Sequence, residues 1–315
     1  MLLLLIELIY INSEIHIIYI LYIMNILSYN VCWECMTNGV KGFGTAKELG
    51  NKCNIKKNCL QNVVDLIDNN SVFLNKEYDF IALQESSNGK QIFKKSNKLN
   101  SKIYKPLYFK SGFEDVMVIF NKEKYSLVQE INGDFEEGRP IQIISFIEKS
   151  SNKNVIFINL HYGFKTKQKN IMIKKLSYYI DLLNNIPSNP EVIIAGDFNY
   201  YWFKQFLNKN DIFYFKPFYY SKNKILKKIK VFSHQKYKTC CDGVNGKNKM
   251  KDNKYNGKSD FIFYNKQIPI NKVLLDNYKL NKIASDHAPI YTILDEFIKT
   301  GSMNKTLKKN KIKKS

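Results

Sequence analysis

Residues 192–199 have the sequence VIIAGDFN, an apolar and β-branched run that ends abruptly in polar residues. A run of this kind is typical of a buried β-strand. Asp197 and Asn199 stand where that strand ends. Functional groups gather at the carboxyl ends of strands in sheets of the α/β type, so this stretch predicts both a central strand and one edge of a site.

Three earlier apolar runs end in the same way. They are NILSYN, which ends at Asn30, DFIALQE, which ends at Glu85, and NVIFINLH, which ends at His161. If all four strands belong to such a sheet, their polar ends meet at one rim.

Two late runs have the reverse pattern and begin with polar groups. SDFIFYN carries Asp260 at its start, and SDHAPIYTIL carries Asp286 and His287. If these strands run antiparallel to the first four, their starts reach the same rim. We then expect four carboxylates, two amides and two of the four histidines in one site.

The rest of the chain alternates between predicted strands and helices. Apolar stripes at helical spacing predict helices over 59–69 and 168–185, whereas residues 115–147 contain two strands without a helix and suggest a hairpin. This mixture predicts an α/β (α+β) protein with helices outside a mixed sheet or two packed sheets. The predicted strands are 26–30, 79–84, 115–120, 141–147, 155–160, 192–195, 260–264 and 289–294.

The set of polar residues has a definite chemical use. Mg²⁺ prefers oxygen ligands and is usually held by one or two carboxylates, together with waters and a substrate phosphate. Histidine serves proton transfer or stabilises charge in a transition state, and a neighbouring carboxylate orients it. The combination suits hydrolysis of a phosphate ester by an activated water.

The motifs SYNV, LQE, NLH, GDFN, KSDFIFYN and SDHAPI follow one another in this order, and with them the sequence resembles the endonuclease/exonuclease/phosphatase superfamily. The resemblance spans about residues 24–298. EDVMVIFN and EGRPIQIISF resemble the central hairpin of that family. The resemblance implies a four-layer sandwich of the deoxyribonuclease I-like type, with two packed mixed β-sheets flanked by helices.

The resemblance also implies a metal and phosphate side of the site. Glu85 would be the principal Mg²⁺ ligand, with Asn30 close to the metal and Asp286 supporting it. Mn²⁺ is the alternative metal. Arg139, the only arginine, would reach the phosphate. Some family nucleases carry a further acid at the position of Cys32, so one metal or two remain open.

The catalytic side is implied in the same way. Asp197 would orient and deprotonate the attacking water, and Asn199 would hold that water or a phosphate oxygen. His287, paired with Asp260, would contact the scissile phosphate. His161 would act on the phosphate or the leaving group.

These roles imply a Mg²⁺-dependent phosphodiesterase, most simply a nuclease. The same chemistry serves phosphoinositide phosphatases and sphingomyelinases, so a lipid phosphoesterase is the first alternative. A non-catalytic nucleic-acid-binding module is the alternative of another class. DNA or RNA as substrate, and endo- or exonucleolytic action, remain open.

The charge of the chain bears on its partner. Lys and Arg total 49 against 28 acids, a net charge of +21, which favours a polyanion: nucleic acid first, or an anionic lipid headgroup. AT-rich codons would produce the same lysine-rich mixture, so charge alone does not decide. We expect a monomer and infer no protein partner.

Two segments flank the predicted domain at 24–298, and a lysine-rich insertion lies within it. Residues 1–23 form an apolar leader that lacks the basic start and cleavage site of a secretory signal, and a membrane anchor is the minority interpretation. Residues 204–258 form an insertion with 15 lysines and three aspartates. Residues 299–315 carry seven lysines and no acid and are expected to be a disordered tail.

The six cysteines are too few for a disulfide scaffold. Cys32 and Cys35 form a C-x-x-C motif without a second such pair, so reduced thiols are favoured over a structural zinc site. We therefore expect an intracellular protein, cytoplasmic or nuclear.

Overall fold

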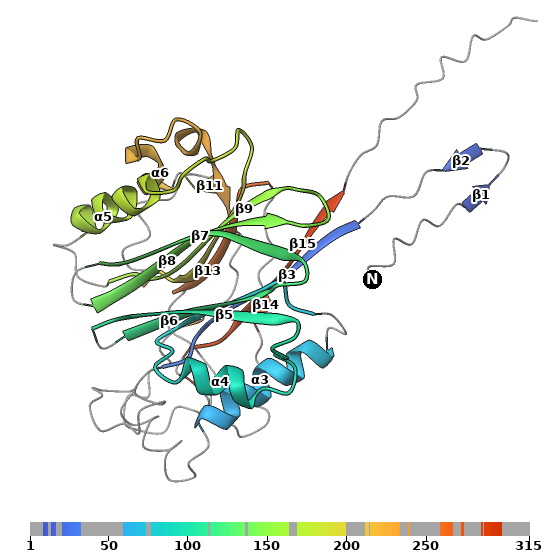
Figure 1. Ribbon diagram of the computed structural model, residues 1–315, viewed down its shortest axis with the longest axis horizontal. Coiled ribbons are helices and arrows are strands. Elements are labelled where there is room, and N and C mark those ends of the chain that lie inside the picture. Colours follow the sequence, from blue (N-terminus) through green and yellow to red (C-terminus); the bar gives the residue numbers. More distant parts are fainter. Residues whose placement is uncertain are drawn as a thin grey trace, which may run out of the picture. The chain divides into compact units, whose positions relative to one another are not determined.

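A computed structural model of the chain has four layers: helices, a sheet, a second sheet and helices again (Figure 1). This is the predicted two-sheet sandwich. The structure describes residues 9–11, 14–16, 21–32, 59–73, 77–112, 114–135, 138–163, 169–199, 212–213, 215–233, 239, 259–266, 272–273, 285 and 287–297.

The larger sheet has seven strands in the order β11-β12-β13-β10-β9-β8-β7. β9 and β10 are parallel, and β13 runs antiparallel to β10, as the sequence predicted for the late strand. The strands are β7 (Tyr125–Phe135), β8 (Arg139–Glu148), β9 (Asn154–His161), β10 (Glu191–Asp197), β11 (Ile212–Phe213), β12 (Val231–Phe232) and β13 (Asp260–Tyr264).

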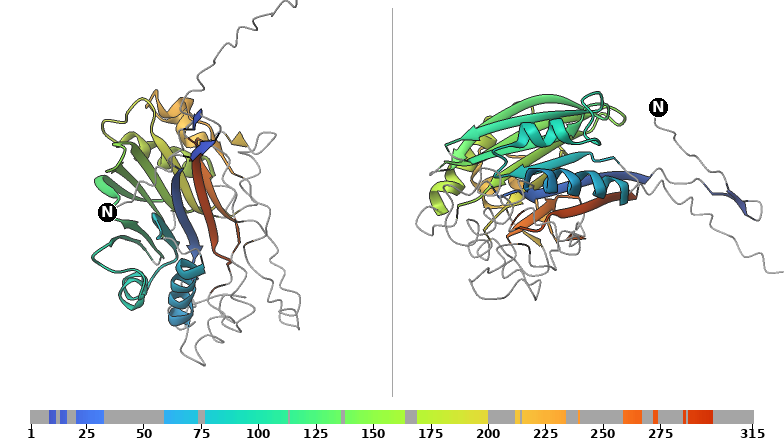
Figure 2. Two further views of the ribbon diagram at one scale, coloured as in Figure 1. Left: turned by 90° about the vertical axis from the view of Figure 1, so that its right-hand side faces the viewer. Right: turned by 90° about the horizontal axis from the view of Figure 1, so that it is seen from below.

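The smaller sheet has six strands in the order β14-β15-β3-β4-β6-β5. β3 and β4 are parallel, and β6 runs antiparallel to β4. The turned views in Figure 2 show the two sheets from other sides. The strands are β3 (Leu21–Asn30), β4 (Phe80–Gln84), β5 (Tyr104–Ser111), β6 (Glu114–Asn121), β14 (Lys272–Val273) and β15 (Ile290–Phe297).

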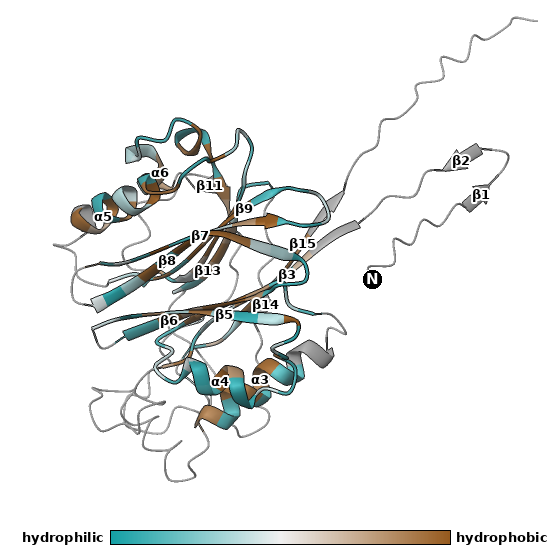
Figure 3. Ribbon diagram, in the orientation of Figure 1, coloured by the Kyte–Doolittle hydropathy of each residue, from teal (hydrophilic) through white to brown (hydrophobic). Residues whose placement is uncertain are grey.

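Helices α3 (Cys59–Phe73) and α4 (Gly89–Lys95) cover the smaller sheet, and α5 (Lys169–Asp181) and α6 (Lys216–Tyr220) cover the larger one (Figure 1). A short 3-10 helix, η4 (Leu226–Lys228), follows α6. Hydrophobic and hydrophilic residues alternate along the helices (Figure 3), and the core clusters include Val63, Val64 and Ile67 of α3 and Met172, Leu176 and Ile180 of α5. Burial of these apolar residues holds α3 and α5 on their sheets.

Aromatic rings and a polar pair lie between the sheets. Phe80 of the smaller sheet packs against Phe146 and Phe157 of the larger one, with ring centroids 5.2 and 4.9 Å apart. Closer to the strand ends, Gln84 and Asn159 form a hydrogen bond across the two sheets. Polar groups therefore enter the interior beside the strand ends.

The expected hairpin over 115–147 is wrong. β6 pairs with β4 and β5, whereas β8 pairs with β7 and β9, so the two predicted strands lie in different sheets. The sequence analysis overlooked β5 and β7, because each is exposed on one face and carries polar residues among its apolar ones.

The chain divides into two compact units, residues 25–293 and a second made of 1–24 and 294–315. Within residues 1–23, strands β1 (Ile9–Ile11) and β2 (Glu14–His16) form an antiparallel pair. The predicted tail at 299–315 lies outside the described residues, as do Cys35 and much of the insertion at 204–258. Among the described residues no helix is long and apolar enough to cross a membrane.

Candidate active site

The register of three neighbouring strands lines up three of the predicted residues. Asp197, the last residue of β10, pairs with His161 at the end of β9 and with Asp260 at the start of β13. Residues that are paired across a sheet project to the same face, so the three side chains lie in a row. All three are buried.

The backbone is unusual where the strands end. Glu85 and Asn199 have φ angles of 54° and 47°, in the left-handed region that side chains other than glycine rarely adopt. Gly196 has a φ of 151°, and a Cβ there would lie 2.0 Å from the carbonyl oxygen of Leu160. Such conformations cost energy and cluster at functional sites, where they aim side chains.

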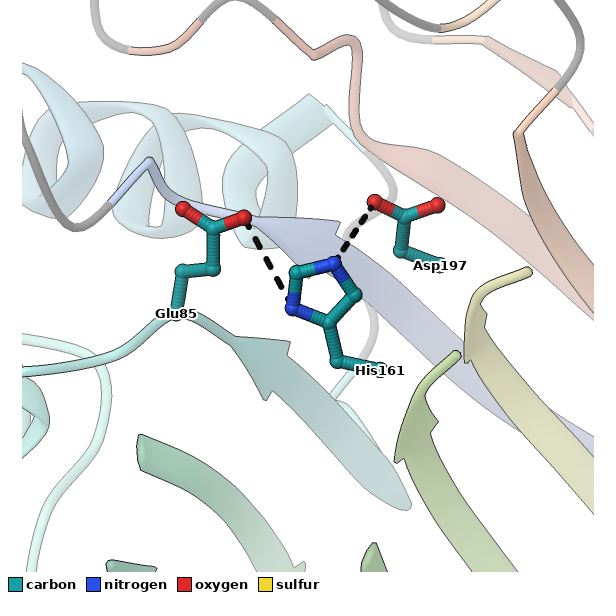
Figure 4. A group of neighbouring side chains, drawn as sticks. All are labelled: Glu85, His161 and Asp197. Carbon is teal, nitrogen blue, oxygen red and sulfur yellow. Dashed lines mark ion pairs between the residues drawn. The ribbon is translucent and has the colours of Figure 1, made fainter. Parts of the chain in front are cut away.

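His161 lies between two carboxylates from the two sheets (Figure 4). Its Nδ1 is 3.6 Å from Oε1 of Glu85, and its Nε2 is 3.4 Å from Oδ2 of Asp197. Burial and the charge of Arg139 lower the pKa of His161, but Glu114 and Asp197 outweigh them and raise it above the usual value. The protonated form of this imidazole is therefore favoured more than in a free histidine.

Glu114, at the start of β6, is a site residue that the sequence analysis did not single out. Its Oε2 lies 2.8 Å from Nδ1 of His161, and its Oε1 lies 2.9 Å from Nη1 of Arg139. Burial raises the pKa of Glu114, but the charges of His161 and Arg139 lower it below the usual value. Glu114 is the first residue of the run EDVMVIFN. Its place at the start of a predicted strand is the sequence feature that could have marked it as a site residue.

His287 is held by Asp260, a buried carboxylate at the start of β13. Nδ1 of His287 lies 2.9 Å from Oδ2 of Asp260, and its Nε2 lies 3.6 Å from Oδ2 of Asp197. Burial raises the pKa of Asp260 to about 6, although the nearby imidazole opposes this. The hydroxyl of Thr239 accepts the N–H of Asp260, and the carbonyl of Thr239 accepts the N–H of Ala288, so Thr239 ties the two motifs together.

Asp197 occupies the centre of this arrangement. Burial raises its pKa, but His287, His161 and hydrogen bonds from the backbone of Asn199 and the side chain of Asn30 lower it below the usual value. Its Oδ2 accepts a 3.0 Å hydrogen bond from Asn30, and its Oδ1 accepts one of 2.9 Å from the N–H of Asn199. The carboxylate is therefore ionised despite its burial.

Asn30 reaches this centre through its side-chain amide, whereas Asn199 reaches it through its backbone N–H. The Nδ2 of Asn30 also donates to Oε1 of Glu85 at 3.0 Å, while the N–H of Cys32 donates to its Oδ1. The amide nitrogen of Asn30 thus faces the carboxylates of Glu85 and Asp197. The Nδ2 of Asn199 donates to the carbonyl of Tyr162 at 2.6 Å, which fixes the turn after β10.

Most of the predicted site residues converge, and one cannot be placed. The structure brings together eight of the nine; Asp286 lies outside the described residues. Arg139, at the start of β8, joins the cluster through Glu114 and His161. The residues that meet are Asn30, Glu85, Arg139, His161, Asp197, Asn199, Asp260 and His287.

The donor set fits a divalent cation. Within the described part of the chain, Glu85, His161 and Asp197 each offer a ligand atom within 4.8 Å of the others, and so do Asp197, Asp260 and His287. Of the carboxylates in these groups Glu85 is the one that is not fully buried. Carboxylate oxygens at an accessible edge suit Mg²⁺, which keeps several waters.

Comparisons with known proteins agree on the architecture. No protein-family model and no curated protein matches the sequence. Solved structures do match, and one is an endonuclease/exonuclease/phosphatase family protein from Bacteroides thetaiotaomicron, with 15% identity over 88% of this chain and 96% of that chain and a TM-score of 0.57. A mannosyl-6-phosphatase from the same species has 15% identity over 87% of this chain and 100% of that chain, with a TM-score of 0.55. D. rerio TDP2 complexed with a single strand DNA product has 15% identity over 86% of this chain and 98% of that chain, with a TM-score of 0.53. The chain therefore has the deoxyribonuclease I-like fold of the endonuclease/exonuclease/phosphatase structures.

Proposed function

We propose that this chain is a metal-dependent hydrolase that cleaves phosphodiester bonds in nucleic acid. The observation that carries the proposal is the buried, ionised Asp197, held between two imidazoles and an amide at the strand ends where the fold gathers its polar groups. A buried carboxylate flanked by two imidazoles is an arrangement that moves protons at a phosphate.

Each residue has one role in the proposed reaction. Asp197 accepts a proton from the attacking water, whose oxygen forms a bond to phosphorus while the ester P–O bond breaks. His287, oriented by Asp260, donates a hydrogen bond to a phosphate oxygen. His161, beside Glu114, donates a proton to the departing oxygen, or it donates a hydrogen bond to the phosphate and the departing oxygen takes its proton from water.

Glu85 is the residue we assign to the metal, with Asp286 as a second expected contact. Mg²⁺, or Mn²⁺ in its place, would neutralise charge on the phosphate when bound. Asn30 holds the Glu85 carboxylate through its Nδ2 and so keeps it beside Asp197.

Two observations favour nucleic acid as the substrate. The net charge of +21 complements a polyanion, and one of the structural neighbours is complexed with a single strand DNA product. Another neighbour is a phosphatase of a phosphorylated sugar, so small phosphate esters belong in any test.

A substrate panel tests the proposal. The purified chain is incubated with DNA, RNA, abasic DNA, inositol phosphates and sphingomyelin, each with Mg²⁺ and with EDTA. We expect cleavage of DNA or RNA that EDTA abolishes. Turnover of a lipid or inositol phosphate alone would replace the nucleic-acid assignment, and strand binding without turnover of any substrate would make the chain a binding module.

A further inference from the structure

Part of the lysine-rich insertion forms an ordered surface of uniform charge. Residues 215–233 have the sequence FKPFYYSKNKILKKIKVFS, with six lysines and no acid. Lys222 and Lys224 are exposed in the turn between α6 and η4, and Lys227 and Lys228 are exposed in η4. This part of the predicted lysine-rich insertion therefore contains regular secondary structure.

The apolar residues of this segment face inward. Phe218 and Leu226 are buried in the core beneath α5, and Ile229 packs against the same core. In contrast, Tyr219 and Tyr220 are 68% and 59% exposed, with their rings edge to face at 5.4 Å. Aromatic rings and ammonium groups therefore dominate what the segment presents to solvent.

The segment is anchored away from the candidate active site. Pro217 accepts a hydrogen bond from the hydroxyl of Ser177 on α5, and the N–H of Lys222 donates to Asp181 at the end of that helix. β12, near the end of the segment, pairs with Tyr264, whereas Asp260 is at the opposite end of β13. At about 3.3 Å per residue these ends lie roughly 13 Å apart.

We propose that Tyr219, Tyr220, Lys222, Lys224, Lys227 and Lys228, the aromatic-lysine surface, dock single-stranded nucleic acid outside the catalytic centre. The proposal deepens the proposed function and rests on it for the link to substrate. Lysines neutralise phosphates, and exposed rings stack on unpaired bases.

The composition of the surface favours a nucleic acid over a membrane. Surfaces that insert into lipid present leucine, phenylalanine or tryptophan beside their basic residues. Here Phe218, Leu226 and Ile229 are turned into the protein. Paired tyrosines with adjacent lysines instead match the stacking and charge pattern of single-strand binding.

The surface has a length-dependent consequence. Because it is remote from Asp260, only a strand long enough to span that distance can contact the surface and the catalytic centre together. Variants of the surface should therefore weaken the binding and cleavage of long strands, whereas the hydrolysis of a small phosphodiester such as bis-p-nitrophenyl phosphate should not change.

Binding is measured by fluorescence anisotropy with a labelled long oligodeoxythymidine, in the full chain carrying Asp197→Asn to prevent cleavage. We expect Tyr219→Ala with Tyr220→Ala to weaken binding about tenfold, and Tyr219→Phe with Tyr220→Phe to have little effect. Lys227→Gln with Lys228→Gln should also lower the slope of log affinity against log salt by about 1.4.

The matched control is Lys94→Gln with Lys95→Gln, which removes two exposed lysines from the last turn of α4. It should leave the affinity and the salt slope close to those of the parent. The proposal is overturned if the control pair weakens binding as much as Lys227→Gln with Lys228→Gln, or if the surface variants bind like the parent. It is also overturned if the surface variants lose only binding to phosphatidylserine vesicles.

The same variants keep this proposal separate from the proposed function. If bis-p-nitrophenyl phosphate and nucleic acids are not hydrolysed with Mg²⁺ by the parent, the proposed function fails, whatever the anisotropy shows. If hydrolysis is intact but the surface variants cleave long strands like the parent, the docking surface alone fails.

Discussion

The Nε2 of Gln84 donates a 2.8 Å hydrogen bond to Oδ1 of Asn159, and this bond joins the two sheets beside the candidate active site. Asn159 also donates to the carbonyls of Leu83 and Met117 in the opposite sheet. Gln84 directly precedes Glu85, and Asn159 lies two residues before His161. The pair thus fixes the spacing between Glu85 and His161.

Removing either partner should destabilise the fold. Gln84→Leu removes the donor to Oδ1 of Asn159, and Asn159→Leu removes the main acceptor of the Gln84 Nε2, so each should lower the free energy of unfolding by about 1–3 kcal/mol. The double variant should cost less than the sum of the single ones, because the hydrogen bond between the two residues is then lost only once. Urea denaturation measures all three, with Asn132→Leu at an exposed position of β7 as the control. Additive losses would show that the bond does not couple the sheets.

Glu114 should act through His161. Glu114→Gln removes the charge that holds the imidazole, and kcat should fall by roughly 10-fold to 100-fold with little change in KM. In a His161→Gln background the same change should have almost no further effect. Steady-state kinetics measures both, and Glu123→Gln at an exposed turn serves as the control. Equal losses in the two backgrounds would assign Glu114 a different role.

Asp79 makes the stability of the protein depend on pH. Burial raises its pKa above 3.8, and the attraction of Lys124 does not fully offset this. A raised folded-state pKa gives stability that is fully present below the unfolded value and lost as pH rises through the folded value. Relative to Asp79→Asn, the free energy of unfolding of the parent should therefore fall as pH rises from below 3.8 to neutral. Urea denaturation across this range measures the difference; a constant or rising difference would contradict the assignment.

Metal dependence should centre on Glu85. Glu85→Gln replaces a carboxylate by a weak ligand, so the Mg²⁺ concentration for half-maximal hydrolysis should rise by more than about tenfold. Addition of Mg²⁺ should raise the melting temperature of the parent but not that of the variant, which gives a readout independent of activity. Glu123→Gln should behave like the parent in both assays. An unchanged Mg²⁺ requirement in Glu85→Gln would place the metal elsewhere.

The sequence predicted site residues correctly where a polar residue stood at the end of an apolar strand. Asn30, Glu85, His161 and Asp197 follow apolar runs, and strand direction alone then predicts that they meet. β5 and β7 were missed, because a sheet face exposed to solvent carries polar residues that interrupt the apolar pattern. Glu114 was missed for a related reason, since an acid at the start of a strand looks like any exposed residue.

The link between Gln84 and Asn159 could not be predicted at all. Each lies within an apolar run, and nothing in either run shows that the two amides face one another across the sheets. The same holds for Thr239, whose contacts with Asp260 and Ala288 depend on how the insertion folds. Pairings between distant strands are set by tertiary packing and not by local pattern.

The central claim is that Asp197 drives phosphodiester hydrolysis in a metal-dependent site, and cleavage of single-stranded DNA by the parent and by Asp197→Asn tests it most directly. Asp134→Asn, on the half-exposed end of β7, is the control. We predict that the parent and the control cleave DNA with Mg²⁺ and not with EDTA, while Asp197→Asn binds the strand and cleaves it at least about 1,000-fold more slowly. Cleavage by Asp197→Asn at the parent rate would contradict the account.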